Sequence, residues 1–359
     1  MNITIVGGGN IGTQFAVHSA AEGHRVTIFT SKPEKFQKHL SIVDGQGKVT
    51  HEGDIHTATA DPKEAFSHAQ VIFVTVPADC MAQYAKQILA HMQPGVKIGL
   101  IPGTGGGECV FKPCVQKGAV LFGLQRVPAV ARLVQYGAQV CSTGYRPTLY
   151  AAALPKSYTN DCCRLLSGIF HMPCEPLPDY LNLTLTPSNP ILHTTRLKTL
   201  YGDYAPGVVY DHIPLFYQHW SDETSRLLFV CDDEVQALCK ALTNFDLSGV
   251  RSLKEHYESD TPEKMTQKIS SIPAFQGLTS PHKVVDGGYI PDLSSRYFTA
   301  DFSYGLAILV QIARFAGVPA PNMEATLQWY QDIANDPPMF CFADFGITNL
   351  EEFNSFYQL

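Results

Sequence analysis

Three residues in the second half of the chain, His193, Arg296 and Asp301, are of the types that proton transfer and anion binding require. A histidine can take up and return a proton near neutral pH, and a carboxylate beside it can fix the tautomer of its ring. An arginine can hold a carboxylate through two parallel hydrogen bonds. The set therefore suits acid–base chemistry on a small carboxylic acid.

The sequence around His193 predicts its place in a helix. Asn189 is a favoured N-cap residue and Pro190 suits the first helical position, so we expect a helix over residues 190–200. His193 then lies in the first turn, near the positive end of the helix dipole, which attracts anions. Each residue also has an ordinary explanation: His193 as a structural histidine, Asp301 as a helix-start acid and Arg296 as a surface ion-pair partner.

A second candidate site lies at the N-terminus, where Gly7-Gly8-Gly9-Asn10-Ile11-Gly12 follows the β-branched run 3–6 and precedes a helical stretch. In such a G-x-G-x-x-G turn the first glycine makes the tight turn, the second admits a pyrophosphate and the third lets the helix pack closely. The helix N-terminus offers N–H donors to the phosphates. We expect a dinucleotide to bind Gly7, Gly9, Asn10, Ile11 and Gly12, the alternative being a glycine-rich turn without a ligand.

The residues after the second expected strand bear on the choice of cofactor. Thr30, Ser31 and Lys32 include no acid, whereas a carboxylate at this point accepts hydrogen bonds from the ribose 2′-OH of NAD. Two hydroxyls and a cation suit a 2′-phosphate, so NADP(H) is favoured and NAD(H) stays open. Lys32 in a solvated surface turn is the alternative.

Two later loops also follow expected strands. Val76 and Pro77 come directly after the apolar run 71–76, and Pro102-Gly103-Thr104-Gly105-Gly106-Gly107 comes after the next strand. Open α/β sheets bind ligands at such strand ends. We therefore assign Val76, Pro77 and Gly105 to the cofactor, with a flexible turn as the alternative for the glycine loop.

The elements that must position these residues divide the chain in two. The first half alternates β-branched runs with helical stretches, which predicts a doubly wound parallel sheet of the Rossmann type. Expected strands are 3–6, 25–30, 71–76, 97–101, 120–124 and 148–154; expected helices are 10–22, 62–69, 82–91 and 159–170.

Beyond about residue 178 the pattern is mostly helical, with helices expected at 190–200, 213–220, 221–242, 262–269, 301–315 and 323–334. The Gly-, Pro- and Ser-rich stretch 271–295 is expected to be a loop over a site. The predicted domains are residues 1–179, which bind NAD(P), and residues 180–359, which form a helical substrate and catalytic domain.

The composition excludes several classes of function. The chain has 26 Lys+Arg and 33 Asp+Glu, a net charge of −7, with 45% hydrophobic residues, so it is neither disordered nor built to bind nucleic acid. The ten cysteines include no C-x-x-C pair and indicate free thiols, with no metal site. There is no signal-peptide pattern and no apolar run of membrane-spanning length, so a cytoplasmic protein without membrane contact is expected. A homodimer is expected only because cyclic dimers are the commonest oligomers.

Three segments together resemble the octopine/nopaline (opine) dehydrogenase family. They are the N-terminal glycine fingerprint, Asn189-Pro190-Ile191-Leu192-His193, and Arg296-Tyr297-x-x-x-Asp301-x-x-Tyr304-Gly305-Leu306. In that family a Rossmann domain precedes a helical domain with these two motifs. The resemblance spans nearly the whole chain, in the right order.

The resemblance implies residue roles that the pattern alone does not. It makes His193 the acid/base, Asp301 its orienting partner and Arg296 a carboxylate contact, and it places His193 near Asp301. Gln125, in a segment similar to the family's loop near the nicotinamide, is implied to touch a keto acid, and the motif residues Asn189 and Tyr304 are assigned to substrate binding. Thr194 and Ser303 stand where the family commonly has proline, so the amino-acid substrate of a characterised member does not transfer.

The implied reaction is the reductive condensation of an amino acid with an α-keto acid, through an imine reduced by NAD(P)H. One alternative is a ketopantoate-reductase-like or other 2-keto acid reductase, or a glycerol-3-phosphate dehydrogenase, which would use a catalytic lysine. Lys198, five residues after His193, and Lys254 and Lys264, later in the chain, are the candidates for that lysine. Another alternative is a non-enzymatic NADP(H)-binding sensor.

Overall fold

A computed structural model describes residues 1–358, which form two compact units, Met1–Thr184 and Leu185–Gln358. The sequence placed the division between residues 179 and 180. Each unit has its own core of buried apolar side chains.

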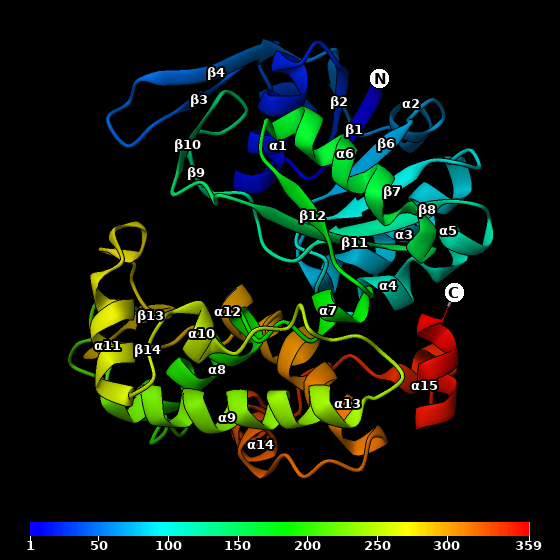
Figure 1. The fold of residues 1–359 in the computed structure, drawn as a ribbon. Coiled ribbons are helices and arrows are strands. Elements are labelled where there is room, and N and C mark those ends of the chain that lie inside the picture. The colour runs from blue at the N-terminus through cyan, green and yellow to red at the C-terminus, as the bar shows by residue number, and fades with distance from the viewer. Residues whose placement is uncertain (359) are drawn as a thin grey trace. The chain divides into compact units, whose positions relative to one another are not determined.

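The first unit is built on a sheet of eight strands in the order β12-β11-β8-β7-β6-β1-β2-β5 (Figure 1). The strands are β1 (Asn2–Val6), β2 (Arg25–Phe29), β5 (Thr57–Thr59), β6 (Val71–Val74), β7 (Lys97–Leu100), β8 (Val120–Leu124), β11 (Leu149–Leu154) and β12 (Cys174–Pro176). All neighbours pair in parallel except β8 and β11, which are antiparallel. The expectation of a wholly parallel sheet is therefore wrong at β11. The Rossmann-type α/β fold itself is confirmed.

The helices of this unit are α1 (Asn10–Ala21), α2 (Pro62–Phe66), α3 (Met81–His91), α4 (Gly107–Val110), α5 (Lys112–Gln116), α6 (Thr159–Phe170) and α7 (Leu181–Thr184). Short 3-10 turns η1 (Pro33–Lys35), η2 (Ala78–Cys80) and η3 (Lys156–Tyr158) join them. The fully apolar strand β6 is buried at every residue, as a central parallel strand requires.

A second sheet that the sequence analysis missed has the order β4-β3-β10-β9 and lies beside α1 (Figure 1). Its strands are β3 (His39–Val43), β4 (Val49–Asp54), β9 (Val130–Gln135) and β10 (Gln139–Thr143). The turn between β3 and β4 carried a signal, because Asp44-Gly45 is a typical hairpin dipeptide. Asp44 Oδ1 accepts the N–H groups of Gln46 and Lys48 there.

This second sheet explains why every residue of α1 from Gly12 to Ser19 is buried, so that no face of the helix is exposed to solvent along this stretch. Gln14 Nε2 donates to Ser142 Oγ at 3.0 Å. A Cβ atom on Gly53 would lie 2.8 Å from Ala20 Cβ, so β4 crosses α1 where only glycine fits. The helix whose N-terminus follows the glycine motif is thus held from two sides.

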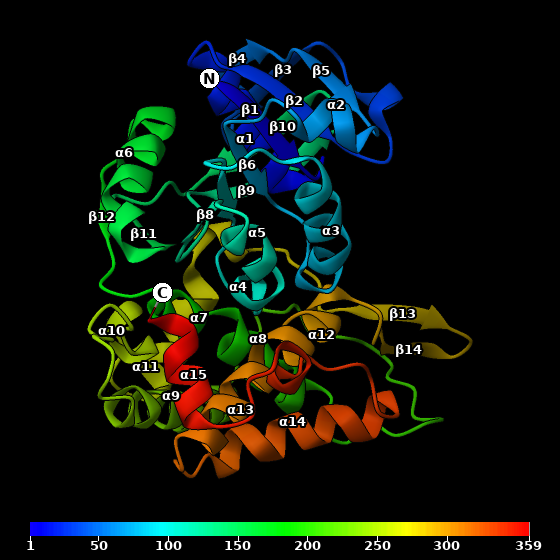
Figure 2. The same ribbon diagram turned by 90° about the vertical axis from the view of Figure 1, so that its right-hand side faces the viewer.

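The second unit is helical and surrounds α8 (Asn189–Leu200), which is buried from Pro190 to Leu197 (Figure 2). Its other helices are α9 (Asp222–Ala241), α10 (Leu253–His256), α11 (Pro262–Ser271), α12 (Arg296–Thr299), α13 (Ala307–Phe315), α14 (Pro321–Ala334) and α15 (Leu350–Tyr357). A π-helical turn η5 (Phe302–Leu306) precedes α13, and 3-10 turns η4 (Pro273–Phe275) and η6 (Phe342–Phe345) complete the unit.

Three expectations for this unit are corrected. Residues 213–220 form turns rather than a helix, because their backbone groups find partners outside a helical ladder: the Phe216 N–H donates to the Leu278 carbonyl, and the carbonyls of Phe216 and His219 accept from the Arg196 side chain. The stretch 271–295 is not structureless, since it contains η4 and the hairpin β13 (His282–Val285) and β14 (Gly288–Pro291). The helix expected from 301 begins as η5, and Asp301 precedes it.

Within residues 1–358, all ten cysteines are free thiols and no group of three or more metal-ligating side chains is found. None of the helices described is long and apolar enough to cross a membrane.

Candidate active site

The glycine turn has the geometry that a pyrophosphate needs. Gly7 has a φ of +103°, and a Cβ on Gly12 would lie 1.8 Å from the Gly7 carbonyl oxygen, so neither position accepts a side chain. A Cβ on Gly9 would meet nothing within 4 Å, which leaves open space before α1. The first turn of α1 has no acidic residue, and its N–H groups are available to an anion.

The segments assigned to the cofactor lie on one edge of the eight-stranded sheet. Strands β2, β1, β6, β7 and β8 are adjacent and parallel, so the residues that follow them emerge side by side. This edge collects Thr30, Ser31 and Lys32 after β2, Gly7 and Gly9 after β1, Val76 and Pro77 after β6, Gly105 after β7 and Gln125 after β8.

Of the three residues that follow β2, one is buried in the fold and two are exposed to solvent. Thr30 is buried, its Oγ1 accepts the Lys32 N–H at 3.3 Å, and it lies 3.4 Å from the Tyr136 hydroxyl. Ser31 and Lys32 are exposed, and no salt bridge of Lys32 is found among the described residues. The Asn10 side chain is anchored to the fold through its Oδ1, which accepts the Leu133 N–H at 2.8 Å; its Nδ2 and backbone N–H are the donors that could reach a phosphate.

The loop after β7 is anchored by Gly103, whose N–H donates to the Leu124 carbonyl at 2.8 Å. Gly105 has a φ of +86°, which glycine adopts without strain. Gln125 is half-buried and its N–H donates to the Tyr150 carbonyl at 2.9 Å, which fixes its backbone at the end of β8.

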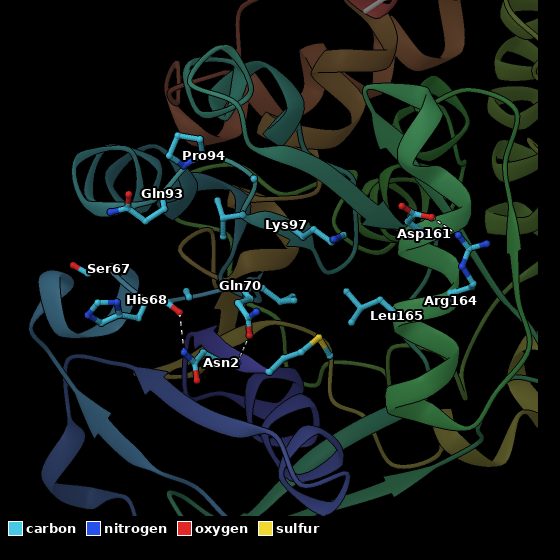
Figure 3. A pocket seen from close by; sticks show the side chains of 15 residues that line it. Asn2, Ser67, His68, Gln70, Gln93, Pro94, Lys97, Asp161, Arg164 and Leu165 are labelled. Carbon is cyan, nitrogen blue, oxygen red and sulfur yellow. Dashed lines mark hydrogen bonds and ion pairs between the residues drawn. The ribbon is translucent and has the colours of Figure 1, made fainter.

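A pocket in the first unit lies away from these segments (Figure 3). Its lining includes Asn2 and Lys97, which begin β1 and β7, together with Leu165 on α6. It therefore opens at the amino ends of the strands, opposite the edge where the glycine turns lie. None of the predicted site residues lines it.

In the second unit His193 and Asp301, 108 positions apart, are in direct contact. His193 Nδ1 lies 2.7 Å from Asp301 Oδ2, and the two side chains are only 8% and 15% exposed. Glycine at position 305 makes this contact possible, because a Cβ there would lie 3.0 Å from Pro190 Cγ. Close packing of η5 on the start of α8 thus brings the carboxylate to the imidazole.

Tyr217 is a further member of the site that the sequence analysis missed. Its hydroxyl lies 2.7 Å from His193 Nε2. Burial raises the pKa of Tyr217 well above its usual value, and the nearby Tyr297 hydroxyl adds to this. Rings also surround the imidazole, with the centroids of Tyr297 at 4.6 Å and Phe216 at 5.5 Å. The aromatic cluster at residues 216–220 was the available signal.

The remaining assigned residues are more open. Arg296 is the first residue of α12, is exposed, and makes no salt bridge among residues 1–358; its Cζ lies 6.0 Å from the Tyr297 ring centroid. The described residues therefore give no support to the alternative that Arg296 is a surface ion-pair partner. Asn189 is exposed and begins α8, with Ser188 rather than Asn189 at the N-cap position. Tyr304 is half-buried within η5.

Comparisons with known proteins agree with both units. Residues 176–334 match the family described as NAD/NADP octopine/nopaline dehydrogenase, alpha-helical domain, and residues 2–103 match the N-terminus of NAD-dependent glycerol-3-phosphate dehydrogenase. The opine dehydrogenase of Haliotis discus hannai is 29% identical over 92% of this chain and 89% of its own length. The tauropine dehydrogenase of Arabella iricolor is 26% identical over 92% and 91%. These matches support the opine dehydrogenase family as the family of this chain.

A solved structure of octopine dehydrogenase with NADH and pyruvate has a TM-score of 0.83 to this chain, at 22% identity, and covers 98% of this chain and 97% of that one. At this identity the likeness concerns the fold, which is that of an opine dehydrogenase. The matches to these two dehydrogenase families and the glycine turn together support a nicotinamide dinucleotide as the cofactor.

The lysines that a ketopantoate-reductase-like mechanism would need are engaged elsewhere. Lys198 Nζ donates to the Ala325 carbonyl at 3.0 Å. Lys254 pairs with Asp233 and Lys264 pairs with Asp260, both at 2.7 Å. These contacts favour His193 over the three lysines as the acid–base group.

Proposed function

We propose that the chain catalyses the reductive condensation of an amino acid with an α-keto acid, giving an N-(carboxyalkyl) amino acid. The observation that carries this proposal is the buried His193–Asp301 contact at 2.7 Å, formed by the two motifs that mark the family. The names of its relatives, tauropine, octopine and opine dehydrogenases, support the same reaction class.

The residues divide the chemistry between them. The nicotinamide, when bound, supplies a hydride to the imine carbon. His193 takes up the ammonium proton of the amino acid, which frees the amine to attack the keto carbon, and later returns a proton to the leaving hydroxyl as water departs. Asp301 holds Nδ1 and stabilises the imidazolium that forms. Arg296, exposed and without a salt bridge in residues 1–358, holds a substrate carboxylate.

The finer choice of cofactor is part of the proposal. NADP(H) is favoured because Ser31 and Lys32 are exposed after β2 and no carboxylate follows this strand directly. The site for the remaining substrate groups is assigned to Gln125, Asn189 and Tyr304. Ten free thiols fit a reducing compartment, so we place the protein in the cytoplasm; size-exclusion chromatography tests the expected homodimer.

The test is the loss of NADPH absorbance, with NADH in parallel, over a matrix of α-keto acids and amino acids, with each keto acid also run without amine. Turnover that requires both substrates is expected. His193→Ala should lower kcat by about 10²–10⁴-fold and leave cofactor affinity unchanged, because the histidine lies in the second unit and the glycine turn in the first.

Two other results would contradict the proposal. Turnover with a keto acid alone would indicate a simple keto acid reductase, in which Arg296 and Asp301 need other roles. Cofactor binding without turnover on any pair would favour a sensor.

A further inference from the structure

Both ring nitrogens of His193 are already engaged in the structure. Nδ1 lies 2.7 Å from Asp301 Oδ2, and Nε2 lies 2.7 Å from the Tyr217 hydroxyl. In the state with a neutral imidazole and an ionised Asp301, the carboxylate only accepts, so the hydrogen-bond network assigns the ring proton to Nδ1 and leaves Nε2 as an acceptor. The Tyr217 hydroxyl therefore donates to Nε2, the atom that would otherwise take a proton from the substrate directly.

Tyr217 is held firmly in this position. Its ring stacks on Phe275, with centroids 4.1 Å apart and planes at 18°, and lies parallel to Trp220 at 6.3 Å. The residue is 5% exposed. A buried side chain that is stacked against neighbouring rings in this way is held in one position.

Arg196 fixes the backbone on both sides of Tyr217. Its Nε donates to the Phe216 carbonyl at 2.9 Å, and its Nη2 donates to the carbonyls of His219 at 2.9 Å and Leu215 at 3.4 Å. Arg196 is 3% exposed, and no salt bridge of this residue is found within residues 1–358, so these carbonyls, together with the Trp220 ring 5.8 Å from its Cζ, compensate its buried charge.

Helix α8 thus carries both the base, His193, and the residue that clamps the backbone around Tyr217, Arg196. Arg196 follows His193 by three residues on α8, so the two side chains lie on neighbouring positions of the same helix. Burial lowers the pKa of Arg196 to about 10, which still leaves the guanidinium charged at neutral pH. The clamp therefore persists throughout the pH range in which a histidine titrates.

We propose that Tyr217 is a further catalytic residue, which relays the proton between the substrate and His193 Nε2. The proposal rests on the proposed condensation. The Tyr217 oxygen takes the ammonium proton as its own proton passes to Nε2, and the imidazolium so formed is stabilised by Asp301. In the second half-reaction Nε2 returns its proton to the Tyr217 oxygen, which gives its own to the departing hydroxyl. One proton moves in each direction, and Tyr217 is neutral before and after each step.

The surroundings of Tyr217 require the two transfers to occur together. Burial and the neighbouring Tyr297 and Asp301 raise the pKa of Tyr217 well above its usual value, so a free tyrosinate is too costly to form between the transfers. Two protons are then in motion in one transition state. This property separates the relay from a purely structural hydrogen bond.

The test compares Tyr217→Phe with Tyr201→Phe. Tyr201 is a matched control, because it is also buried in the second unit and its hydroxyl donates to the Pro281 carbonyl at 2.8 Å, away from His193. Tyr217→Phe should lower kcat by roughly 10²-fold with little change in KM, whereas Tyr201→Phe should keep kcat and lose only thermal stability. A second readout is the rate in H₂O/D₂O mixtures, which should show two exchanging protons in the wild type.

The outcomes separate the relay from the function that it serves. Wild-type turnover with an unchanged or increased kcat in Tyr217→Phe, or with a single exchanging proton, would overturn the relay alone. Absence of any two-substrate turnover in the wild type would overturn the proposed function. If Tyr217→Phe does not fold, 2,3-difluorotyrosine at position 217 keeps the shape and makes the hydroxyl more acidic. The relay then requires kcat to change, and an unchanged kcat overturns it. Imidazole ¹⁵N chemical shifts, which report the bond at Nε2 without turnover, should change in Tyr217→Phe and not in Tyr201→Phe.

Discussion

At the scale of single residues, the site joins a buried acid–base group with an open cation. His193 and Asp301 are almost enclosed, which strengthens their interaction, whereas Arg296 is exposed with no salt bridge found in the described chain. An exposed guanidinium without a carboxylate partner costs nothing to desolvate until a ligand arrives. It is therefore suited to binding a substrate carboxylate and not to holding the fold together.

Replacement of Arg296 measures this assignment. Arg296→Gln should raise KM for one carboxylate substrate by about 10–100-fold, because a charge-assisted hydrogen bond contributes roughly 1.5–3 kcal/mol. Arg296→Lys keeps the charge but not the two-pronged donor geometry and should fall between Gln and wild type. Separate titrations of keto acid and amino acid show which substrate is held. Unchanged KM values for both would remove Arg296 from the site.

At the scale of elements, the site depends on how closely η5 packs against the first turn of α8. Gly305 faces Pro190 where a Cβ would lie 3.0–3.1 Å from two of its ring atoms. The π-helical turn widens the backbone just after Asp301, and such turns are common at functional sites. The position of the Asp301 carboxylate is thus set by the start of η5, whereas His193 is carried by a different element, α8.

Gly305→Ala tests this packing. The added methyl should push η5 from α8 by a few tenths of an ångström and lower kcat by roughly tenfold or more, since small misplacements of reacting groups are costly. Gly168→Ala is the control, because Gly168 lies in α6 with nothing within 4 Å of its would-be Cβ. That change should raise stability by about 0.5–1 kcal/mol and leave kcat as it is. Equal kcat in both variants would contradict the packing argument.

The sequence predicted elements where the signal is local and missed those defined by distant partners. Val120–Leu124 and Thr159–Phe170 have the predicted bounds, because each is a continuous pattern of its own. The hairpin of β3 with β4 carried the local Asp44-Gly45 signal and could have been predicted, whereas the parallel pairing of β3 with β10, where Gln139 reaches Ser41 across 98 positions, could not. Pairing of this kind leaves little trace in either segment alone.

The site divides in the same way. His193 and Asp301 stood in motifs with helix-start signals, and the resemblance supplied their proximity. Tyr217 lies in a segment predicted to be a helix, and the Arg196 side chain helps to hold this segment in turns by donating to three of its carbonyls. No spacing rule connects a buried arginine with the backbone 20 residues away, so this contact required the structure.

At the scale of the molecule, each unit buries a titratable group outside the site, and the two groups respond to pH in opposite directions. Burial lowers the pKa of His18 on α1 from 6.5 to about 3, helped by His51 and His171. Burial raises the pKa of Asp232 on α9 from 3.8 to about 7. Below pH 6.5 the unfolded chain binds a proton at His18 that the folded first unit does not, so acid destabilises this unit. Between pH 3.8 and 7 the folded second unit holds a proton at Asp232 that the unfolded chain loses, so rising pH destabilises that one.

Calorimetry of His18→Gln and Asp232→Asn against the wild type isolates these two contributions. Between pH 8 and pH 5.5 the wild type should lose about 1 kcal/mol of stability that His18→Gln retains, since the pH then lies one unit below 6.5. Between pH 5.5 and pH 8 the wild type should lose about 2 kcal/mol of stability that Asp232→Asn retains. The asparagine oxygen can still accept the Leu253 N–H, which Asp232 Oδ2 accepts at 2.7 Å. Two thermal transitions that move apart with pH are expected if the units unfold separately. A difference from the wild type that does not change with pH in either variant would show that the group titrates alike in the folded and unfolded chain.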